Sequence, residues 1–328
     1  MKWQYTFILA LCCFAAAGAQ PPASIEEPLV YTGAADGSAA VALDATHFAT
    51  ASDEDSVIRV YSRTHGGAPL WSINLTQFLQ VPAAAPETDI EAATRIGDRA
   101  YWLSSHGRNQ RGLERTAHYR FFATDIRTNG VLPQLVPVGQ PGKTLLTDLV
   151  REPQLLPFNL ADAAGRAPKS PGALSIEGLC ATPDKHLLIG FRNPVPQGQA
   201  LAVPLLNPDE VIQGKRASFG PPIHLDLGGL GIRSMAYWGG RYLLIAGPFD
   251  GKGQSRLYQW KGGEGKAKLL KDVRLKGLNP EAIVVYPDKG RDEFQLLCDD
   301  SKEEKPGLFG KPGSAIFRKQ FRSVWIAP

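Results

Sequence analysis

The chain has 328 residues, of which 21% are charged and 43% are hydrophobic, which is the composition of a globular protein long enough to bury a core. Its formal net charge of +4 is small and dispersed, which argues against a nucleic-acid-binding protein. The 34 glycines and 26 prolines indicate many turns. The length would permit two domains, but all-β folds often run past 250 residues as one domain.

The N-terminus has the features of an export signal. Lys2 supplies a positive charge, the run from Phe7 to Ala17 is apolar but too short to span a bilayer, and Ala17-Gly18-Ala19 fits the small-x-small cleavage rule. We therefore expect residues 1–19 to be a cleaved signal peptide and residues 20–328 to be one periplasmic or secreted domain. A lipid anchor at Cys12 is disfavoured by the preceding leucine, and no later segment is long and apolar enough for a transmembrane span.

A short phrase recurs along the chain, and each copy is followed by an apolar strand, a turn and a second apolar strand. Its three copies are Asp89-Ile90-Glu91-Ala92, Ser175-Ile176-Glu177-Gly178 and Asn279-Pro280-Glu281-Ala282. With two related segments, the repeated units start near Ala39, Glu91, Glu177, Arg233 and Glu281, at spacings of 52, 86, 56 and 48 residues. A period near 50 with four short strands is typical of a β-propeller blade.

The sequence thus predicts an all-β protein, a β-propeller of five four-stranded blades. The long spacing would hold a short helical insert near 140–172, and the count would be six if that insert contained a degenerate blade. The strand 29–31 is expected to complete the last blade and close the ring. A β-sandwich with chance similarities is the alternative. Cys180 and Cys298 fall in units that are not neighbours, so we expect two buried thiols and no disulfide.

The repeat also predicts where polar side chains meet. In a propeller the innermost strand of each blade runs along the central channel and the next strand returns, so the start of the first strand and the end of the second share one face. Asp53, His106, Arg192 and Asp299 should therefore lie on one rim with the three glutamates.

Carboxylates that converge on one funnel need a cation or an arginine beside them. We expect Glu91, Glu177, Glu281, Asp53 and Asp299 to be able to hold Ca²⁺, which prefers oxygen ligands, and Arg233 to compensate part of the charge. The alternative is that each glutamate caps backbone amides at a blade junction and has no role beyond stability.

Two matching polar stretches predict an anion-binding rim. Ser104 to Asn109 contains His106 and Arg108, and Gly190-Phe191-Arg192-Asn193-Pro194 stands at the matching place in the third unit. Arg108, Arg192, Arg233 and Asn193 are the donors that could hold a phosphate, sulfate or carboxylate. The alternative for the first stretch is a solvated basic loop.

Several longer phrases resemble an exported bacterial family labelled domain of unknown function 3616. They are Asp53 to Tyr61, Gly97 to Asn109, Ile176 to Leu179, Leu188 to Pro194, Leu201 to Pro208 and Leu227 to Gly240. A looser resemblance, carried by Ile176-Glu177-Gly178, is to the phytase-like esterase propellers, although Ala92 and Ala282 replace the glycine in the other copies. The looser resemblance implies an exported hydrolase of phosphate or related esters.

Two classes of function follow. The first is a monomeric binding propeller that recognises a small anionic molecule, a glycan or a component of the cell envelope at its central funnel. The second is a metal-assisted phosphoesterase in which Glu177 contributes to catalysis and His106 moves a proton. A purely structural protein without a small-molecule site is the third alternative.

Overall fold

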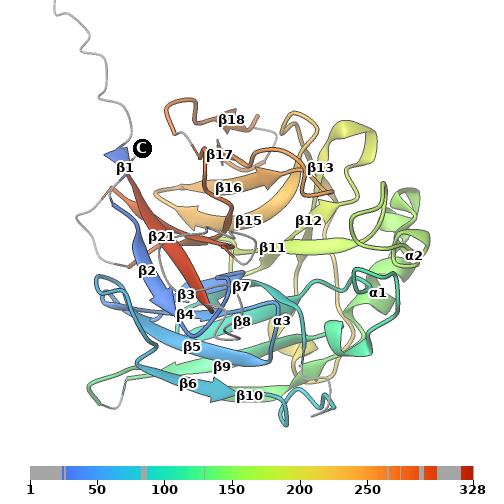
Figure 1. Ribbon diagram of the computed structural model, residues 1–328. Helices are drawn as coiled ribbons and strands as arrows, with labels where there is room; N and C mark the ends of the chain where they lie inside the picture. Colours follow the sequence, from blue (N-terminus) through green and yellow to red (C-terminus); the bar gives the residue numbers. More distant parts are fainter. Residues whose placement is uncertain are drawn as a thin grey trace, which may run out of the picture.

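The computed structural model describes residues 24–25, 27–82, 87–128, 130–263, 266–273, 275–287, 292–300 and 319–327. The expected signal peptide, residues 1–19, lies outside the described residues. The described chain forms five antiparallel sheets, set around a ring with one inner strand from each sheet towards the centre (Figure 1). The predicted five-bladed β-propeller is confirmed. None of the helices in the described ranges is long and apolar enough to cross a membrane.

The first four blades are built in simple chain order, from the inner strand outwards. Blade 1 contains β3 (Ala39–Ala42), β4 (His47–Ala51), β5 (Val57–Ser62) and β6 (Trp71–Asn74). Blade 2 contains β7 (Ile90–Ile96), β8 (Arg99–Ser104), β9 (Phe121–Arg127) and β10 (Gln134–Gly142). Blade 3 contains β11 (Ser175–Ala181), β12 (Leu187–Asn193), β13 (Ala200–Leu205) and β14 (Ile223–Leu225). Blade 4 contains β15 (Gly231–Trp238), β16 (Arg241–Gly247), β17 (Arg256–Trp260) and β18 (Lys268–Leu269).

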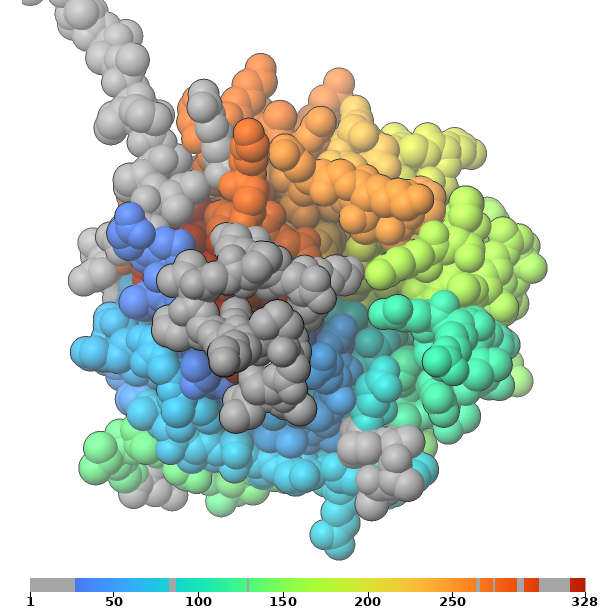
Figure 2. Space-filling view, in the orientation of Figure 1, coloured from blue at the N-terminus to red at the C-terminus, as the bar shows by residue number. Residues whose placement is uncertain are grey.

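Blade 5 joins the two ends of the chain. Its inner strands are β19 (Pro280–Val284), β20 (Phe294–Cys298) and β21 (Gln320–Ala327), and the outer edge of β21 pairs with β2 (Leu29–Thr32) and β1 (Ser24–Ile25). The Tyr31 ring stacks on Phe321 at 5.3 Å, and its hydroxyl donates to Ser62 O at 3.0 Å. The predicted closure by residues 29–31 is therefore confirmed. Figure 2 shows the blades following one another around one face in chain order.

A helical insert lies between β10 and β11. It contains α1 (Leu145–Arg151), a 3₁₀ helix (Pro153–Phe158) and α2 (Leu160–Ala163), at the outer edge of the ring (Figure 1). A further short helix, α3 (Pro208–Val211), follows β13. Leu145 and Leu160 are buried against blades 2 and 3, so the insert packs on an existing blade junction and does not form a sixth blade.

The apolar core is divided into five clusters, and each one lies between two neighbouring blades. Between blades 3 and 4, Gly178 and Gly190 allow Ile232 and Met235 to approach closely, because a Cβ on either glycine would lie less than 3 Å from the Ile232 side chain. Burial of a large apolar side chain contributes about 1.5–3 kcal/mol. The clusters therefore hold each inner strand at a fixed place around the axis.

Four of the five inner strands carry an irregularity at the same place. The register with the second strand shifts between Ile90 and Ala92, between Ile176 and Gly178, between Ile232 and Ser234, and between Pro280 and Ala282. The residue left out of the pairing is, in order, Glu91, Glu177, Arg233 and Glu281. Because a β-bulge re-aims a side chain, these four residues can point towards the axis while their neighbours stay paired. The regular ladder of blade 1 starts at Ala39.

Candidate functional site

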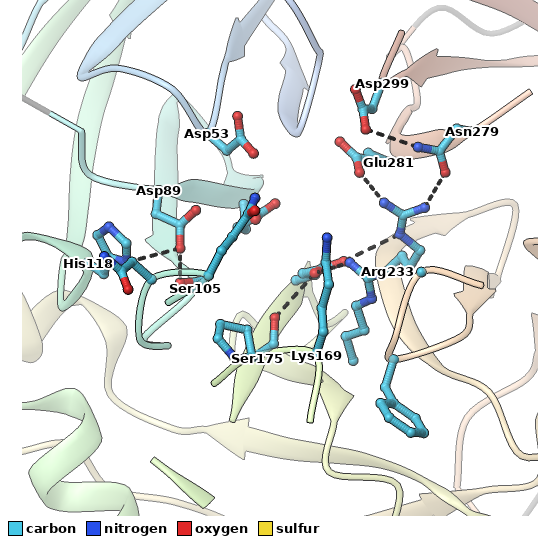
Figure 3. Close-up of a pocket in the computed structure, with 18 of the residues that line it drawn as sticks. Asp53, Asp89, Ser105, His118, Lys169, Ser175, Arg233, Asn279, Glu281 and Asp299 are labelled. Carbon is cyan, nitrogen blue, oxygen red and sulfur yellow. Dashed lines mark hydrogen bonds and ion pairs between the residues drawn. The ribbon is translucent and has the colours of Figure 1, made fainter. Parts of the chain in front are cut away.

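The starts of the inner strands surround a cavity of about 400 Å³, which we call the funnel. Eight of the predicted site residues line it: Asp53, Glu91, Glu177, Glu281, Asp299, Arg108, Arg192 and Arg233. They come from all five blades or the loops beside them, so the structure brings them together as the repeat predicts. Figure 3 shows two polar groups facing each other across the funnel, one around Asp89 and the other around Arg233.

The Arg233 side chain links three blades on one side of the funnel. It is 6% exposed, its Nε donates to Glu177 Oε2 at 3.4 Å, and its Nη1 donates to Asn279 Oδ1 at 2.6 Å. Its Nη2 forms an ion pair with Glu281. Asn279 in turn donates to Asp299 Oδ2 at 3.1 Å. The arginine position of the repeat thus compensates the glutamate positions of two neighbouring blades.

Glu177 is held by a second arginine as well. Arg192 Nη1 donates to Glu177 Oε1 at 2.7 Å, and Ser175 Oγ donates to the same oxygen at 3.2 Å. Burial by itself would raise the pKa of Glu177, but Arg192 and Arg233 outweigh that effect and lower the pKa. Glu177 is therefore ionised at neutral pH.

Three carboxylates on the opposite side of the funnel have no arginine or lysine paired with them among the described residues. Asp53, Asp89 and Glu91 each offer an oxygen within 4.8 Å of the others. Burial and the neighbouring carboxylates raise the pKa of Glu91, and no hydrogen bond or ion pair in the described chain reaches its side chain. The same causes raise the pKa of Asp53 to about 10. No arginine or lysine of the described chain therefore compensates these three carboxylates, in contrast to Glu177 and Glu281.

Asp53 rests on another carboxylate, Asp36, which is 2% exposed. Asp36 accepts hydrogen bonds from Ser38 Oγ and Ser52 Oγ, each at 2.6 Å, and from the Asp53 amide at 3.3 Å. Ser38 Oγ also contacts Glu281 Oε2 at 3.1 Å, across the junction of blades 1 and 5. The hydroxyls satisfy Asp36, whereas Asp53 faces the funnel. Two adjacent buried carboxylates favour retention of a proton, which a bound cation would displace.

Sequence reasoning assigned no role to Asp89 and His118. Asp89 stands two residues before Glu91, the position of Ser175 and Asn279 in the other copies of the phrase, and all three line the funnel. Its carboxylate accepts a hydrogen bond from Ser105 and lies 3.3 Å from His118 Nδ1. Asp89 also has φ +54°, an uncommon conformation for a residue other than glycine. The −2 position of the repeat is the signal that could have identified Asp89, whereas nothing in the sequence singles out His118.

His106 and Asn193 do not line the funnel. His106 is buried, its Nδ1 lies 2.8 Å from Ser104 O, and burial lowers its pKa to about 4. Asn193 donates to Pro168 O at 3.0 Å and to Ser170 O at 2.8 Å, so it anchors the end of the insert. These contacts hold both side chains outside the cavity. The roles predicted for His106 and Asn193 remain predictions.

The remaining cations of the funnel come from loops. Arg108 lines the cavity and donates through Nε to Ala164 O at 3.0 Å, which ties the loop after β8 to the helical insert. Lys169 belongs to the insert and points between the two polar groups (Figure 3). The insert thus adds cationic groups to a funnel whose inner strands supply mostly carboxylates.

Residues 131–301, just over half of the chain, match the family model described as "Protein of unknown function (DUF3616)". The chain belongs to this family. The match includes Glu177, Arg233 and Glu281, whereas Asp53 and Glu91 precede it. No functionally curated protein matches the chain in sequence.

Solved structures with a similar course of the chain have low sequence identity. Glutaminyl cyclase from Myxococcus xanthus gives a TM-score of 0.48 at 13% identity, covering 93% of this chain and 96% of that chain. A putative oxidoreductase (glucose dehydrogenase) from Thermus thermophilus gives 0.44 at 13% identity, covering 93% and 99%. The PQQ-bound aldose sugar dehydrogenase from Streptomyces coelicolor gives 0.43 at 10% identity, covering 93% and 100%. Likeness at this level says nothing about the chemistry of the funnel.

Proposed function

We propose that the protein is an exported binding propeller. Its funnel would hold a divalent cation on Asp53, Asp89 and Glu91, and through that cation it would bind an anionic small molecule, glycan or envelope component. The observation that carries the proposal is the convergence of these three carboxylates within 4.8 Å without an arginine or lysine partner in the described chain. Ca²⁺ is the best match, because it accepts oxygen ligands in flexible geometry, and weak sites are common in extracellular modules.

The charge of the funnel explains why an anion would need the cation. Eight carboxyl groups and four arginine or lysine side chains line it, an excess of four carboxyl groups. Two of the four cations, Arg192 and Arg233, are already paired with glutamates. An anion that enters alone would meet paired arginines on one side and, on the other, carboxyl groups without an arginine or lysine partner in the described chain. Ca²⁺ takes 6–8 oxygen ligands, so three carboxylates leave positions at which a ligand's phosphate or carboxylate could bind, beside Arg108 and Lys169.

The first test measures cation binding directly. Chelator-treated protein is titrated with CaCl₂ at pH 7 by calorimetry, in two buffers of different ionisation enthalpy. One Ca²⁺ should bind and release at least one proton, because Asp53 has a pKa of about 10 before the cation arrives and the pKa of Glu91 is raised as well. Glu91→Gln keeps the shape of the side chain, removes a ligand charge and should weaken binding at least about tenfold. Glu54 lines the same funnel but lies outside the three-carboxylate group, so Glu54→Gln serves as the matched control.

The second test asks whether the cation recruits an anion. Inorganic phosphate and simple sugar acids are screened by thermal shift with CaCl₂ or with chelator. Stabilisation by an anion should require Ca²⁺ and should be lost in Glu91→Gln. The absence of bound divalent metal from the wild-type protein, by both calorimetry and elemental analysis, would end the proposal.

A metal-assisted hydrolase of phosphate or related esters is the second candidate. The observation that favours it is His118, a buried imidazole 3.3 Å from the Asp89 carboxylate and 3.5 Å from Glu87. At that place His118 could hold a proton near a metal-bound ester, the task that the sequence suggested for His106. Turnover of a panel of phosphate esters that depends on Ca²⁺ and falls in His118→Gln would favour the hydrolase over the binding propeller.

A further inference from the structure

The opposite end of the propeller carries a second cavity, of about 520 Å³, which we call the distal cavity. It is bounded by the last residues of the inner strands and by the hairpins that follow them. Glu91 and Ile96 are five residues apart on β7, so the two cavities are separated by roughly 15 Å along the axis. The volume falls within the range of about 300–1,000 Å³ that small-molecule pockets occupy.

Small side chains at the axis create the space. Ala40 and Ala42 of β3, Ala93 of β7, Ala181 of β11 and Ala236 of β15 all line the distal cavity. The walls are larger apolar and aromatic residues, namely Ile96, Met235, Tyr237, Trp238, Ile283, Val285 and Tyr286. Several of these side chains also belong to the apolar clusters between blades, and at the axis they leave a concave, mainly apolar surface.

Two of the aromatic side chains are held in place by contacts outside the cavity. The Trp238 ring meets Phe294 edge-on at 5.6 Å, and the Arg241 guanidinium lies 5.4 Å from the Trp238 ring centroid. The Tyr237 ring meets the Tyr242 ring edge to face at 5.0 Å. Because these rings are already ordered, a ligand that stacks on them loses little conformational freedom of the protein.

The charged groups of the distal cavity are all positive. Arg95 and Lys185 line it, and no Asp or Glu is among the described lining residues. Arg95 donates from Nη1 to the carbonyl oxygens of Ala42 and Leu43 and from Nε to that of Gly97, at 2.9–3.0 Å. Its nearest carboxylate partner, Asp98, lies 3.5 Å away and is 89% exposed. Lys185 stands in the exposed hairpin between β11 and β12.

From this combination we propose that the distal cavity binds a small molecule with a flat apolar body and one carboxylate. The apolar body would lie against Trp238 and Tyr237 over the alanine-lined axis, and the carboxylate would face Lys185 and Arg95. The two ends of the propeller therefore differ in the charge that they present. The distal cavity offers cationic groups to a carboxylate, whereas the funnel at the other end is lined mainly by carboxyl groups. The inference does not depend on the proposed cation site.

The test uses two probes of the same shape. Naphthalene-2-carboxylate and naphthalene-2-carboxamide are measured by equilibrium dialysis against the full chain. The carboxylate should bind about fivefold more tightly, the ratio expected from one partly exposed ion pair. Lys185→Glu should remove that preference, whereas Lys268→Glu, an exposed charge reversal on the outer strand β18, should retain it.

Filling the cavity provides an independent check. Ala93→Leu and Ala181→Leu should each weaken both probes by at least about tenfold, because the added methylenes occupy the axial space. Circular dichroism and urea unfolding identify the variants that keep the fold, and Lys185→Glu remains decisive because its side chain is exposed. Equal affinity for the two probes, or unchanged affinity in a folded filling variant, would overturn the proposal.

Discussion

Replacing Glu177 by glutamine tests how the funnel tolerates its buried charge. The Glu177 side chain is 6% exposed, and both Arg192 and Arg233 donate to it. The substitution removes the carboxylate that both buried guanidinium groups share. An arginine stays charged at any pH at which the protein is folded, so the positive charge beside the substituted side chain would be only partly compensated. Breaking a buried ion pair from one side costs about 3–5 kcal/mol. Because the glutamine oxygen can still accept one hydrogen bond, we expect a loss of about 3 kcal/mol.

The assay is urea unfolding at pH 7 and fixed chelator concentration. With an m-value of about 2.5 kcal/mol per M, the midpoint should fall by about 1 M. The effect should depend on pH with a definite sign. The pKa of Glu177 is lowered in the folded protein, so its contribution is present above the unfolded value and is lost as the pH falls through the folded value. Wild type and Glu177→Gln should therefore converge in stability at acidic pH.

Two further variants separate buried from exposed electrostatics. Asp162→Asn breaks the pair between Asp162 and Arg166, whose side chains are 52% and 49% exposed, and should cost no more than about 1 kcal/mol. Adding Arg192→Met to Glu177→Gln removes one uncompensated charge and should restore part of the stability. A loss below about 1 kcal/mol in Glu177→Gln, or a loss that is unchanged at pH 3, would refute the reasoning.

Three other predictions concern protons, backbone contact and thiols. Without Ca²⁺ the free energy of unfolding should fall as pH rises from about 5 to 8, by up to about 1.4 kcal/mol per pH unit for each group. The reason is that Glu281, with a folded pKa of about 8, and Asp53, with about 10, bind protons more tightly in the folded than in the unfolded chain. In a chemical-denaturation series, saturating Ca²⁺ should remove the part of this slope that comes from Asp53, a proposed ligand, and leave the part that comes from Glu281. Gly231→Ala should lower the thermal midpoint strongly, because its Cβ would lie 1.9 Å from Arg192 O, whereas an alanine at the open position Gly97 is limited to the strain of its positive φ. Cys180 should resist alkylation at pH 8 until the protein unfolds, since the thiol is buried and burial raises its pKa; rapid labelling of the native protein by mass spectrometry would contradict this.

The fold could be predicted because the repeated units are visible in the sequence itself, as similar phrases followed by paired apolar strands at a spacing near 50 residues. The spacing between Glu91 and Glu177 already contains the helical insert, and the pairing of residues 29–32 with β21 follows from an unmatched strand at one end. The insert begins later than residue 140, because β10 continues to Gly142. Cys180 and Cys298 are buried and unpaired among the described residues, as expected.

The site was predicted less completely because its geometry depends on the bulges. A register shift of one residue leaves no mark in the sequence, so the division of the carboxylates into an arginine-paired side and an unpaired side could not be anticipated. His106 illustrates the difficulty. The prediction assumed an extended chain after β8, but His106 has φ +55°, so its ring turns away from the funnel that the adjacent Ser105 lines and lies buried beside Ser104 O. His118, whose carbonyl accepts a hydrogen bond from the His106 amide, ends a short 3₁₀ helix (Thr116–His118) that lies outside the repeated phrase.

The bulges also separate the side chains that line the funnel from the backbone pairing that holds each blade together. A residue that takes no part in the strand ladder can be a glutamate in one blade and an arginine in the next while the neighbouring residues stay paired, as Arg233 illustrates beside Glu177 and Glu281. Such positions, which we call sockets, can carry different side chains on the same sheet, so the polar lining of a funnel can change while the scaffold stays the same. Blade 1, with its uninterrupted ladder from Ala39, has no socket, and giving it one would require an inserted residue and not merely a substituted one.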